Sequence, residues 1–297
     1  MTPNGYFQSI VIGTLAGFLT RLFLLERDYR NYPSYPHGYI IHLSLGAIAA
    51  ALAAIAIPAL LEREYTAITF LVMCAQEFRN IRSMERETLS KLERDLLVPR
   101  GLDYIEGIAK VFEARNYLVM LVALMTTGVT VFINIKWGII LGLALVWLSR
   151  LLMSGKTIGD MVAVQEGVLH FEGPLLMVDD IVIMNVGEQK AKEKIVAEGI
   201  GVVLTPKDKV AREVINNIGQ RQAILHNIAV LVGLKTEVGE PQFTPLCRKN
   251  VDTGAVGIYV LPNEHRVDEV IRAVKMAPLL ESAVVKPFKK QSISKSE

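Results

Sequence analysis

Ionisable side chains inside apolar segments are the first candidates for chemistry in this sequence of 297 residues. Arg21 lies four residues from the end of the apolar segment 7–25, and His42 lies three residues into the segment 39–61. A charged group is costly in hydrocarbon, so such a residue often marks an ion pathway or a proton relay. Both residues also lie near segment ends, where long side chains can reach the polar interface. Transport and interfacial anchoring therefore both stay open.

Two other motifs contain residue types that could form a reaction site. Asp179 and Asp180 are adjacent, so a strand would point them to opposite sides, which favours turn residues over a metal site. The string "SGKT" at 154–157 resembles the end of a phosphate-binding loop, but Arg150 occupies the position of the required glycine. No histidine or cysteine has the spacing of a metal ligand set. We predict no catalytic residue, metal or cofactor; an enzyme would have to use Asp179, Asp180 and Glu106.

Apolar segments long enough to cross a membrane fill most of residues 1–154. A helix needs about 20 residues to cross about 30 Å of hydrocarbon. A shorter apolar segment, Tyr65–Gln76, spans only if the flanking arginines reach the interface. The sequence therefore predicts an α-helical membrane bundle of four or five transmembrane helices. The four longer segments are 7–25, 39–61, 117–135 and 137–153.

Positive charge predicts the orientation of these helices. Residues 79–115, within a charged helical segment near 77–116, contain eight lysines and arginines. Cytoplasmic loops are enriched in these residues. With either four or five spans, this segment and the C-terminal half lie in the cytoplasm. The start "MTPNGYFQS" lacks a basic region, so we expect the first span to be retained in a multi-pass protein of the cell membrane.

Small residues predict close helix packing in this bundle. Gly13 and Gly17 have the GxxxG spacing, and alanines dominate the second segment. Small side chains let helix backbones approach closely in lipid. These two glycines are therefore helix-packing candidates, either inside one bundle or at a self-association face.

The stretch "LDYIEGIAK" places a glycine inside a predicted helix at the membrane edge. Asp103 can cap this helix, and Glu106 has the spacing of a capping box. Gly107 costs about 1 kcal/mol relative to alanine, so it needs another reason. It shares a face with Tyr104 and would form a notch there. Close approach of another helix or a partner is the favoured interpretation, with a kink and a catalytic role as alternatives.

The string "YIEGIA" with the multispanning segments resembles the YIEGIA family of bacterial membrane proteins, which is associated with endospore-forming Firmicutes. The resemblance implies a membrane protein linked to sporulation in a bacterial cell membrane, and it supplies no catalytic residues. We assign partner docking to the six residues of this motif. They are Tyr104, Ile105, Glu106, Gly107, Ile108 and Ala109.

Residues 155–288 change to short apolar runs that alternate with helical stretches, which predicts a cytoplasmic α/β or α+β domain. Its closing strand-helix-strand unit is similar to half of a ferredoxin-like or ACT-like domain, and residues 289–297 form a polar tail. Expected strands are 168–171, 181–186, 200–204, 256–261 and 283–286. Expected helices are 188–198, 207–231 with a possible break at Gly219, and 264–280.

These features favour a non-enzymatic scaffold or assembly factor of the spore envelope. Its expected partners are the lipid bilayer and one or more proteins of a membrane assembly, with self-association also possible. The net charge of +2 provides no basic field for nucleic acid. A transporter or lipid-handling protein, and a membrane-tethered enzyme, are the alternatives.

Overall fold

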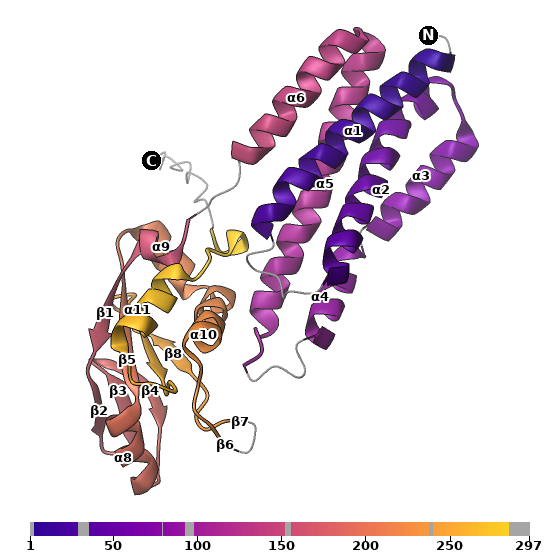
Figure 1. Cartoon of the computed structure of the whole chain (residues 1–297). Helices are drawn as coiled ribbons and strands as arrows, with labels where there is room; N and C mark the ends of the chain where they lie inside the picture. The colour runs from indigo at the N-terminus through magenta and orange to yellow at the C-terminus, as the bar shows by residue number, and fades with distance from the viewer. Residues whose placement is uncertain are drawn as a thin grey trace, which may run out of the picture. The chain divides into compact units, whose positions relative to one another are not determined.

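The computed structural model describes residues 3–28, 36–78, 80–92, 98–151, 156–237 and 240–284. The chain forms two compact units (Figure 1). The helical unit contains residues 1–91 and 108–155, and the globular unit contains residues 92–107 and 156–297. The division therefore falls inside the helix that carries the YIEGIA string. The predicted tail at 289–297 lies outside the described residues.

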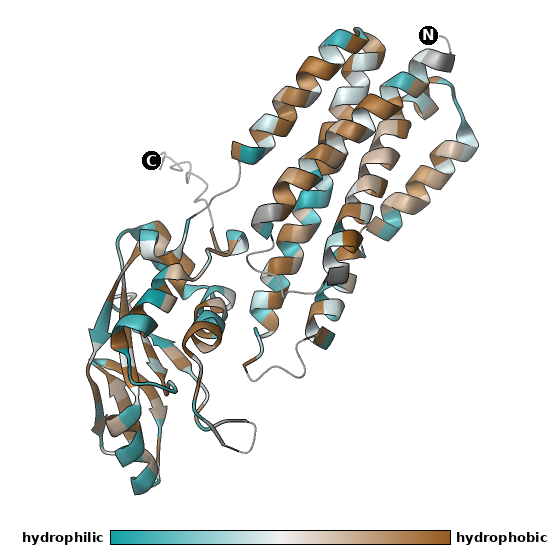
Figure 2. Ribbon diagram, in the orientation of Figure 1, coloured by the Kyte–Doolittle hydropathy of each residue, from teal (hydrophilic) through white to brown (hydrophobic). Residues whose placement is uncertain are grey.

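Within the part of the chain that the structure describes, three helices are long and apolar enough to cross a membrane. Their spans are Gly5–Leu25 in α1, Gly38–Leu61 in α2 and Leu102–Phe132, which is α5. Figure 2 shows that hydrophobic residues predominate along these helices. The fourth predicted segment forms α6, which has only 17 residues, and the short fifth forms α3 with 14 residues. The helices are α1 Pro3–Asp28, α2 Pro36–Leu61, α3 Tyr65–Phe78, α4 Ile81–Leu92, α5 Leu102–Phe132 and α6 Ile135–Leu151.

Small residues bring α1, α2 and α5 together within the helical unit. A Cβ atom built on Gly17 would lie 2.7 Å from the Cβ of Ala50 on α2, and Gly13 faces Thr127 on α5. Around these contacts, the alanine face of α2 packs against Phe112 and Val119 of α5. The structure thus places both glycines of the GxxxG spacing against helices of the same chain.

The helices α3 and α4 follow α2 in the opposite direction. Ile68, near the start of α3, lines the same groove as Leu60, near the end of α2. Phe78 and Ile81, at the junction of α3 and α4, pack in the cluster that contains Ala49 of α2. An α-helix rises about 1.5 Å per residue, so α3 alone is roughly 21 Å long. This length is short for a span, as the 12-residue apolar segment suggested.

The globular unit contains two main antiparallel sheets. The larger sheet has the strand order β1-β5-β9-β8, and the smaller has the order β2-β3-β4. Every described strand pair is antiparallel, so this unit has an α+β rather than a parallel α/β arrangement. The strands are β1 Val162–Gly167, β2 Leu169–Glu172, β3 Leu175–Val178, β4 Ile181–Asn185, β5 Ile200–Pro206, β6 Thr236–Glu237, β7 Glu240–Pro241, β8 Leu246–Lys249 and β9 Val256–Val260.

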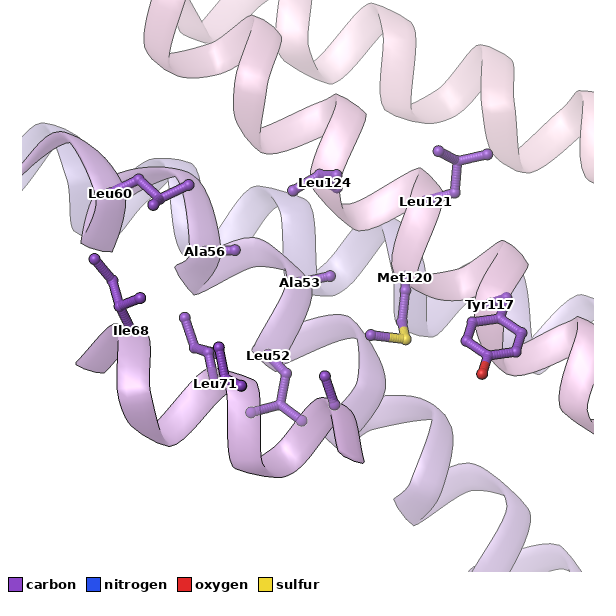
Figure 3. A pocket seen from close by; sticks show the side chains of 12 residues that line it. Leu52, Ala53, Ala56, Leu60, Ile68, Leu71, Tyr117, Met120, Leu121 and Leu124 are labelled. Carbon is purple, nitrogen blue, oxygen red and sulfur yellow. The ribbon is translucent and has the colours of Figure 1, made fainter. Parts of the chain in front are cut away.

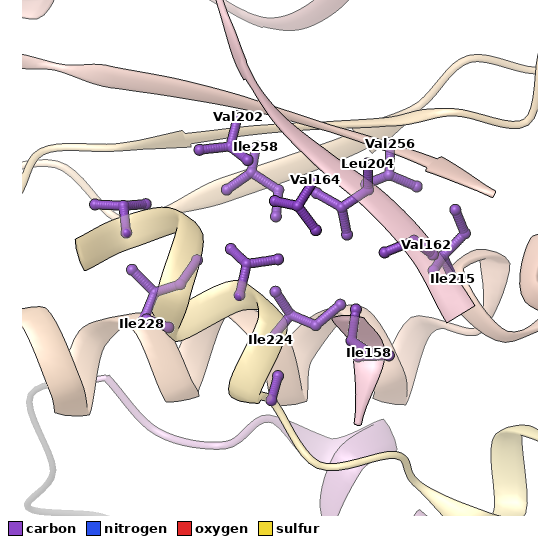
Figure 4. Packing of buried hydrophobic residues seen from close by; sticks show 14 of the residues in the cluster. Ile158, Val162, Val164, Val202, Leu204, Ile215, Ile224, Ile228, Val256 and Ile258 are labelled. Atoms are coloured by element: carbon purple, nitrogen blue, oxygen red, sulfur yellow. The ribbon is translucent and has the colours of Figure 1, made fainter. Parts of the chain in front are cut away.

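Alternating side chains build a core on each face of the larger sheet. Val202 and Ile258 pack toward the helices on one face (Figure 4). Val203 and Tyr259, each one residue along the same strand, pack with the smaller sheet on the other face. Successive side chains of a strand point to opposite faces, so β5 and β9 need apolar residues throughout. The helices of this unit are α7 Ile158–Met161, α8 Gln189–Glu198, α9 Lys209–Asn216, α10 Ile218–Val232 and α11 Val267–Met276.

The structure corrects several predicted elements. The break between α9 and α10 lies at Asn217 rather than Gly219, because the Asn217 side chain accepts a hydrogen bond from the Gln220 N–H and caps α10. The strand predicted at 283–286 is wrong at Ala283, which ends a 3-10 helix, η1 Glu281–Ala283. Residues 285 and 286 lie outside the described part of the chain. The sequence also failed to predict β1, β3 and β8 as strands.

Candidate functional sites

The YIEGIA motif begins in the first turn of α5 and is largely buried. Tyr104 and Ile105 are each 3 % exposed, and Ala109 is fully buried. The predicted cap was wrong: α5 starts at Leu102, so Asp103 lies inside its first turn. Instead, the Tyr104 N–H donates a hydrogen bond of 2.9 Å to the side-chain oxygen of Gln222 on α10. A side chain from the globular unit therefore satisfies a backbone donor that a helix start leaves without an intrahelical partner.

The surroundings of Gly107 explain why the motif contains a glycine. A Cβ atom on Gly107 would lie 2.5 Å from Cδ2 of Leu280 and 2.8 Å from the hydroxyl oxygen of Ser282. Leu280 is held there because its N–H donates to the Gln220 side chain at 2.7 Å. The notch predicted at Gly107 is therefore filled by a segment of the same chain. Binding of another protein by the motif stays a prediction.

Helix α10 supplies the residues that hold the motif in place. Gly219 allows close approach to the backbone of Asp103, because a Cβ atom there would lie 2.6 Å from the Asp103 carbonyl oxygen. His226 Nδ1 lies 2.9 Å from the carbonyl oxygen of Val98, just before α5. We call five residues together the motif cradle. Four of them lie on α10 and the fifth follows α11: Gly219, Gln220, Gln222 and His226, with Leu280. No local pattern pointed to the two glutamines, because their partners are 60 and 118 positions away in the chain.

The hydrogen bond from Gln222 gives a direct test of the motif cradle. We expect Gln222→Ala to accelerate hydrogen exchange of the Tyr104 amide about fivefold, since a typical hydrogen bond contributes about 1 kcal/mol. Hydrogen exchange of the full chain, followed by mass spectrometry of peptides that contain Tyr104, measures this change. Gln189→Ala is the matched control, because Gln189 is exposed and bonds to Glu193 on its own helix. Equal exchange at Tyr104 in both variants would contradict the assigned cap.

The second candidate site is a buried group of charges in the helical unit. Arg21 is fully buried, and its Nη1 donates to Asp28 Oδ2 at 2.8 Å. The other oxygen of Asp28 lies 3.3 Å from Nε of Arg115 on α5. One carboxylate thus joins two arginines, and Nη2 of Arg21 has no hydrogen-bond partner among the described residues.

The predicted residue His42 lies beside Arg21 in the same group. Its Nε2 is 3.3 Å from Oε1 of Glu85 on α4, and both side chains are buried. Phe112 of α5 lies between the two predicted residues, with its ring 4.6 Å from the His42 ring and 5.2 Å from the Arg21 guanidinium carbon. Stacking of a guanidinium on an aromatic face is favourable when both are desolvated.

We call this group the charge cluster, formed by Arg21, Asp28, His42, Glu85 and Arg115. The sequence identified Arg21 and His42 but missed their three partners. Asp28 and Arg115 lie just beyond apolar segments, where charges are ordinary, and Glu85 lies in a segment rich in charges of both signs. Two arginines and two carboxylates balance, so a neutral His42 leaves the cluster without net formal charge. Such an arrangement can stabilise a helix junction or carry a proton.

The remaining acidic candidates occupy structural positions. Asp179 and Asp180 form the turn between β3 and β4, and Asp179 has a positive φ of 47°. Oδ1 of Asp179 accepts a hydrogen bond of 2.7 Å from the Val168 N–H. Among the described residues, no three side chains of the metal-binding types gather in one place.

The thiol of Cys247 on β8 provides a pH test of the globular core. Burial raises the pKa of this thiol, and nearby Arg221 and Arg248 only partly oppose the effect. We therefore expect alkylation of Cys247 in a Cys74→Ser variant to stay slow near neutral pH. Its rate should rise with a midpoint above the value of about 8.5 typical of free cysteine, because only the thiolate reacts. A midpoint at or below that of free cysteine, measured under the same conditions, would contradict the partly buried placement of this thiol.

The structure thus defines a protein with apolar helices of membrane-spanning length and an α+β unit, and the division between the two units falls inside the motif of α5. A family model described as YIEGIA protein matches residues 9–290, and the chain therefore belongs to the YIEGIA family. The chain is similar to YphB from Bacillus subtilis (strain 168), whose name describes it as an uncharacterized protein. The two are 43 % identical over 284 residues, which cover 96 % of each chain. No solved structure matches the chain.

Proposed function

We propose that this protein is a multi-pass membrane scaffold of spore-forming bacteria whose globular unit binds a partner in the cytoplasm during assembly of the spore envelope. The observation that carries the proposal is the motif cradle. The first four residues of the family motif belong to the globular unit, where the Tyr104 N–H bonds to Gln222 and Gly107 lies against Leu280, and the same helix continues into the helical unit. A helix that is anchored in this way suits a protein that holds a partner at the membrane.

A five-span arrangement fits this proposal. In it, α1, α2, α3, α5 and α6 cross the bilayer, with α3 as a short span that continues into α4. The junction of α3 and α4 packs near Phe112, just before the apolar part of α5, so α4 would begin near the cytoplasmic surface. The eight basic residues of 79–115 then lie on the cytoplasmic side. Reaction of single cysteines at exposed positions of α4 and the globular unit with a membrane-impermeant reagent tests this arrangement.

The chemistry of the described residues favours a scaffold over an enzyme. Asp179 is engaged in a turn, as its bond to the Val168 N–H shows, and Glu106 lies in the motif helix. Asp180, the third acid considered for catalysis, lies in the same turn as Asp179. We also propose that part of the globular unit has a ferredoxin-like or ACT-like fold, which a solved structure would test.

Deletion of the gene for this protein from its native bacterium tests the link to sporulation. We expect normal vegetative growth and spores with a defective envelope, visible by electron microscopy and as reduced resistance to lysozyme. Restoring the wild-type gene provides the control for the deletion. Spores with an intact envelope and normal resistance would overturn the proposed role.

Ion or proton movement is the second candidate function, because the charge cluster is buried among the helices of the helical unit. A His42–Glu85 contact of 3.3 Å can pass a proton between the two side chains. Proteoliposomes with an internal pH dye test this function by comparing wild type with His42→Gln. Proton flux that disappears in the variant would favour transport, and equal background rates would leave the scaffold as the better account.

A further inference from the structure

An apolar groove runs along the helical unit between α2, α3 and α5. Its volume is about 510 Å³, within the range of small-molecule sites. Ala53 and Ala56 of α2 line it together with Ile68 of α3 and Leu121 of α5, and Tyr117 lies at one end (Figure 3). Apart from the Tyr117 hydroxyl, the lining side chains have no polar group that could hydrogen-bond a polar ligand.

The position of the groove along the helices decides what can fill it. Its walls on α2 and α5 belong to the two candidate spans Gly38–Leu61 and Leu102–Phe132. In hydrocarbon, an open apolar groove is filled by a lipid chain or by another helix. The small side chains of Ala53 and Ala56 deepen the groove between flexible leucine and methionine walls, which suits a narrow, flexible chain.

Charge at the Tyr117 end of the groove favours a lipid with an anionic headgroup. Glu113, one turn before Tyr117 on α5, pairs with Arg82 of α4 at 3.8 Å. Both side chains of this pair are partly exposed, and such pairs are weak in water. Arg86 is exposed on the same helix, whereas the acid between the two arginines, Glu85, is buried against His42. Arg82 and Arg86 are thus the basic groups of the first half of α4, and the pair with Glu113 places Arg82 near the Tyr117 end of the groove.

We propose that this groove binds one acyl chain of an anionic phospholipid, with the phosphate near Arg82 and Arg86. The chain lies along Ala53 and Ala56, and the headgroup lies beyond Tyr117. This inference does not depend on the proposed scaffold function, because it rests on the helical unit alone. It gives the protein a defined lipid at its membrane end.

Native mass spectrometry of the full chain in mild detergent tests the site. The probes are phosphatidylglycerol and phosphatidylcholine with the same acyl chains. We expect one tightly bound phosphatidylglycerol and an affinity about tenfold lower for Ala56→Phe, equivalent to about 1.4 kcal/mol. Ala144→Phe is the matched control, because Ala144 is exposed on α6 and lies outside the groove. The double variant Arg82→Gln with Arg86→Gln should lose the preference for phosphatidylglycerol over phosphatidylcholine and keep chain binding.

A second measurement needs no variant. Phosphatidylglycerol with a photoreactive acyl chain should label peptides that contain Leu121 or Ile68 more strongly than the exposed α6 peptide that contains Leu143. Equal labelling of these peptides would overturn the proposal, as would equal lipid binding by the two phenylalanine variants. A dimer that Ala56→Phe converts to a monomer would show that a second copy of the chain fills the groove, and this would also overturn it.

Discussion

Asp28→Asn is expected to cost the helical unit about 3–5 kcal/mol, the largest effect of any single change that we predict. The substitution leaves Arg21 and Arg115 buried without the carboxylate that now contacts both. An unpaired buried charge loses its Coulomb partner and cannot regain its hydration. The free energy of unfolding in mild detergent can be measured by denaturant titration, with Trp137 and Trp147 of α6 as fluorescent reporters.

Two further variants separate the charge cluster from a general loss of charge. Glu87→Gln is the matched control, because Glu87 pairs with Lys91 at 2.7 Å while both side chains are mostly exposed. Exposed pairs contribute about 0–1 kcal/mol. Asp28→Asn combined with Arg115→Gln restores charge balance and should recover part of the lost stability. If Asp28→Asn destabilises no more than Glu87→Gln does, the buried network does not stabilise the bundle.

Gly107→Leu is expected to detach the segment around Leu280 from the motif helix. The new side chain would occupy the space of Leu280 and Ser282, and overpacking of this kind costs about 1–3 kcal/mol. Part of this cost is offset, because leucine gains about 1 kcal/mol of helix propensity over glycine. We expect a net cost of about 1 kcal/mol and faster hydrogen exchange in peptides that cover 278–284.

Gly187→Leu is the matched control for this change. No atom lies within 4 Å of the position that a Cβ atom on Gly187 would take, and such surface substitutions usually change stability by less than about 0.5 kcal/mol. A Leu280→Ala substitution added to Gly107→Leu should restore part of the protection elsewhere in the motif cradle. Unchanged exchange at 278–284 in Gly107→Leu would show that the contact at Gly107 is not tight.

Composition and periodicity were sufficient for the elements with strong local signals. The length of the apolar runs predicted α1 and α2, and short apolar runs between helical stretches predicted β5 and β9. The missed strands have weaker signals: β8 reads "LCRK" with two charges, and β3 has only four residues. The capping role of Asn217 was hidden by the nearby Gly219, because a helix break can be produced by either residue type.

The candidate sites were only partly accessible from sequence because their contacts are long-range. A helical pattern showed that Gly107 needs a special neighbour, but Leu280 is 173 positions away in the chain. Similarly, an arginine in a span indicates a buried partner, yet nothing local distinguishes Asp28 or Arg115 from other charges at span ends. Tertiary packing alone decides which of them become buried.

The central claim, that the globular unit binds a partner during sporulation, can be tested most directly by photocrosslinking in cells. A photoreactive amino acid placed at an exposed apolar position, such as Val168, Val182 or Val251, captures whatever contacts that surface. The account predicts that one position, or a few neighbouring ones, captures the same protein in sporulating cells and not in growing cells. If no tested position forms a specific adduct, or if the same adducts form during growth, the scaffold account is contradicted and transport becomes the better hypothesis.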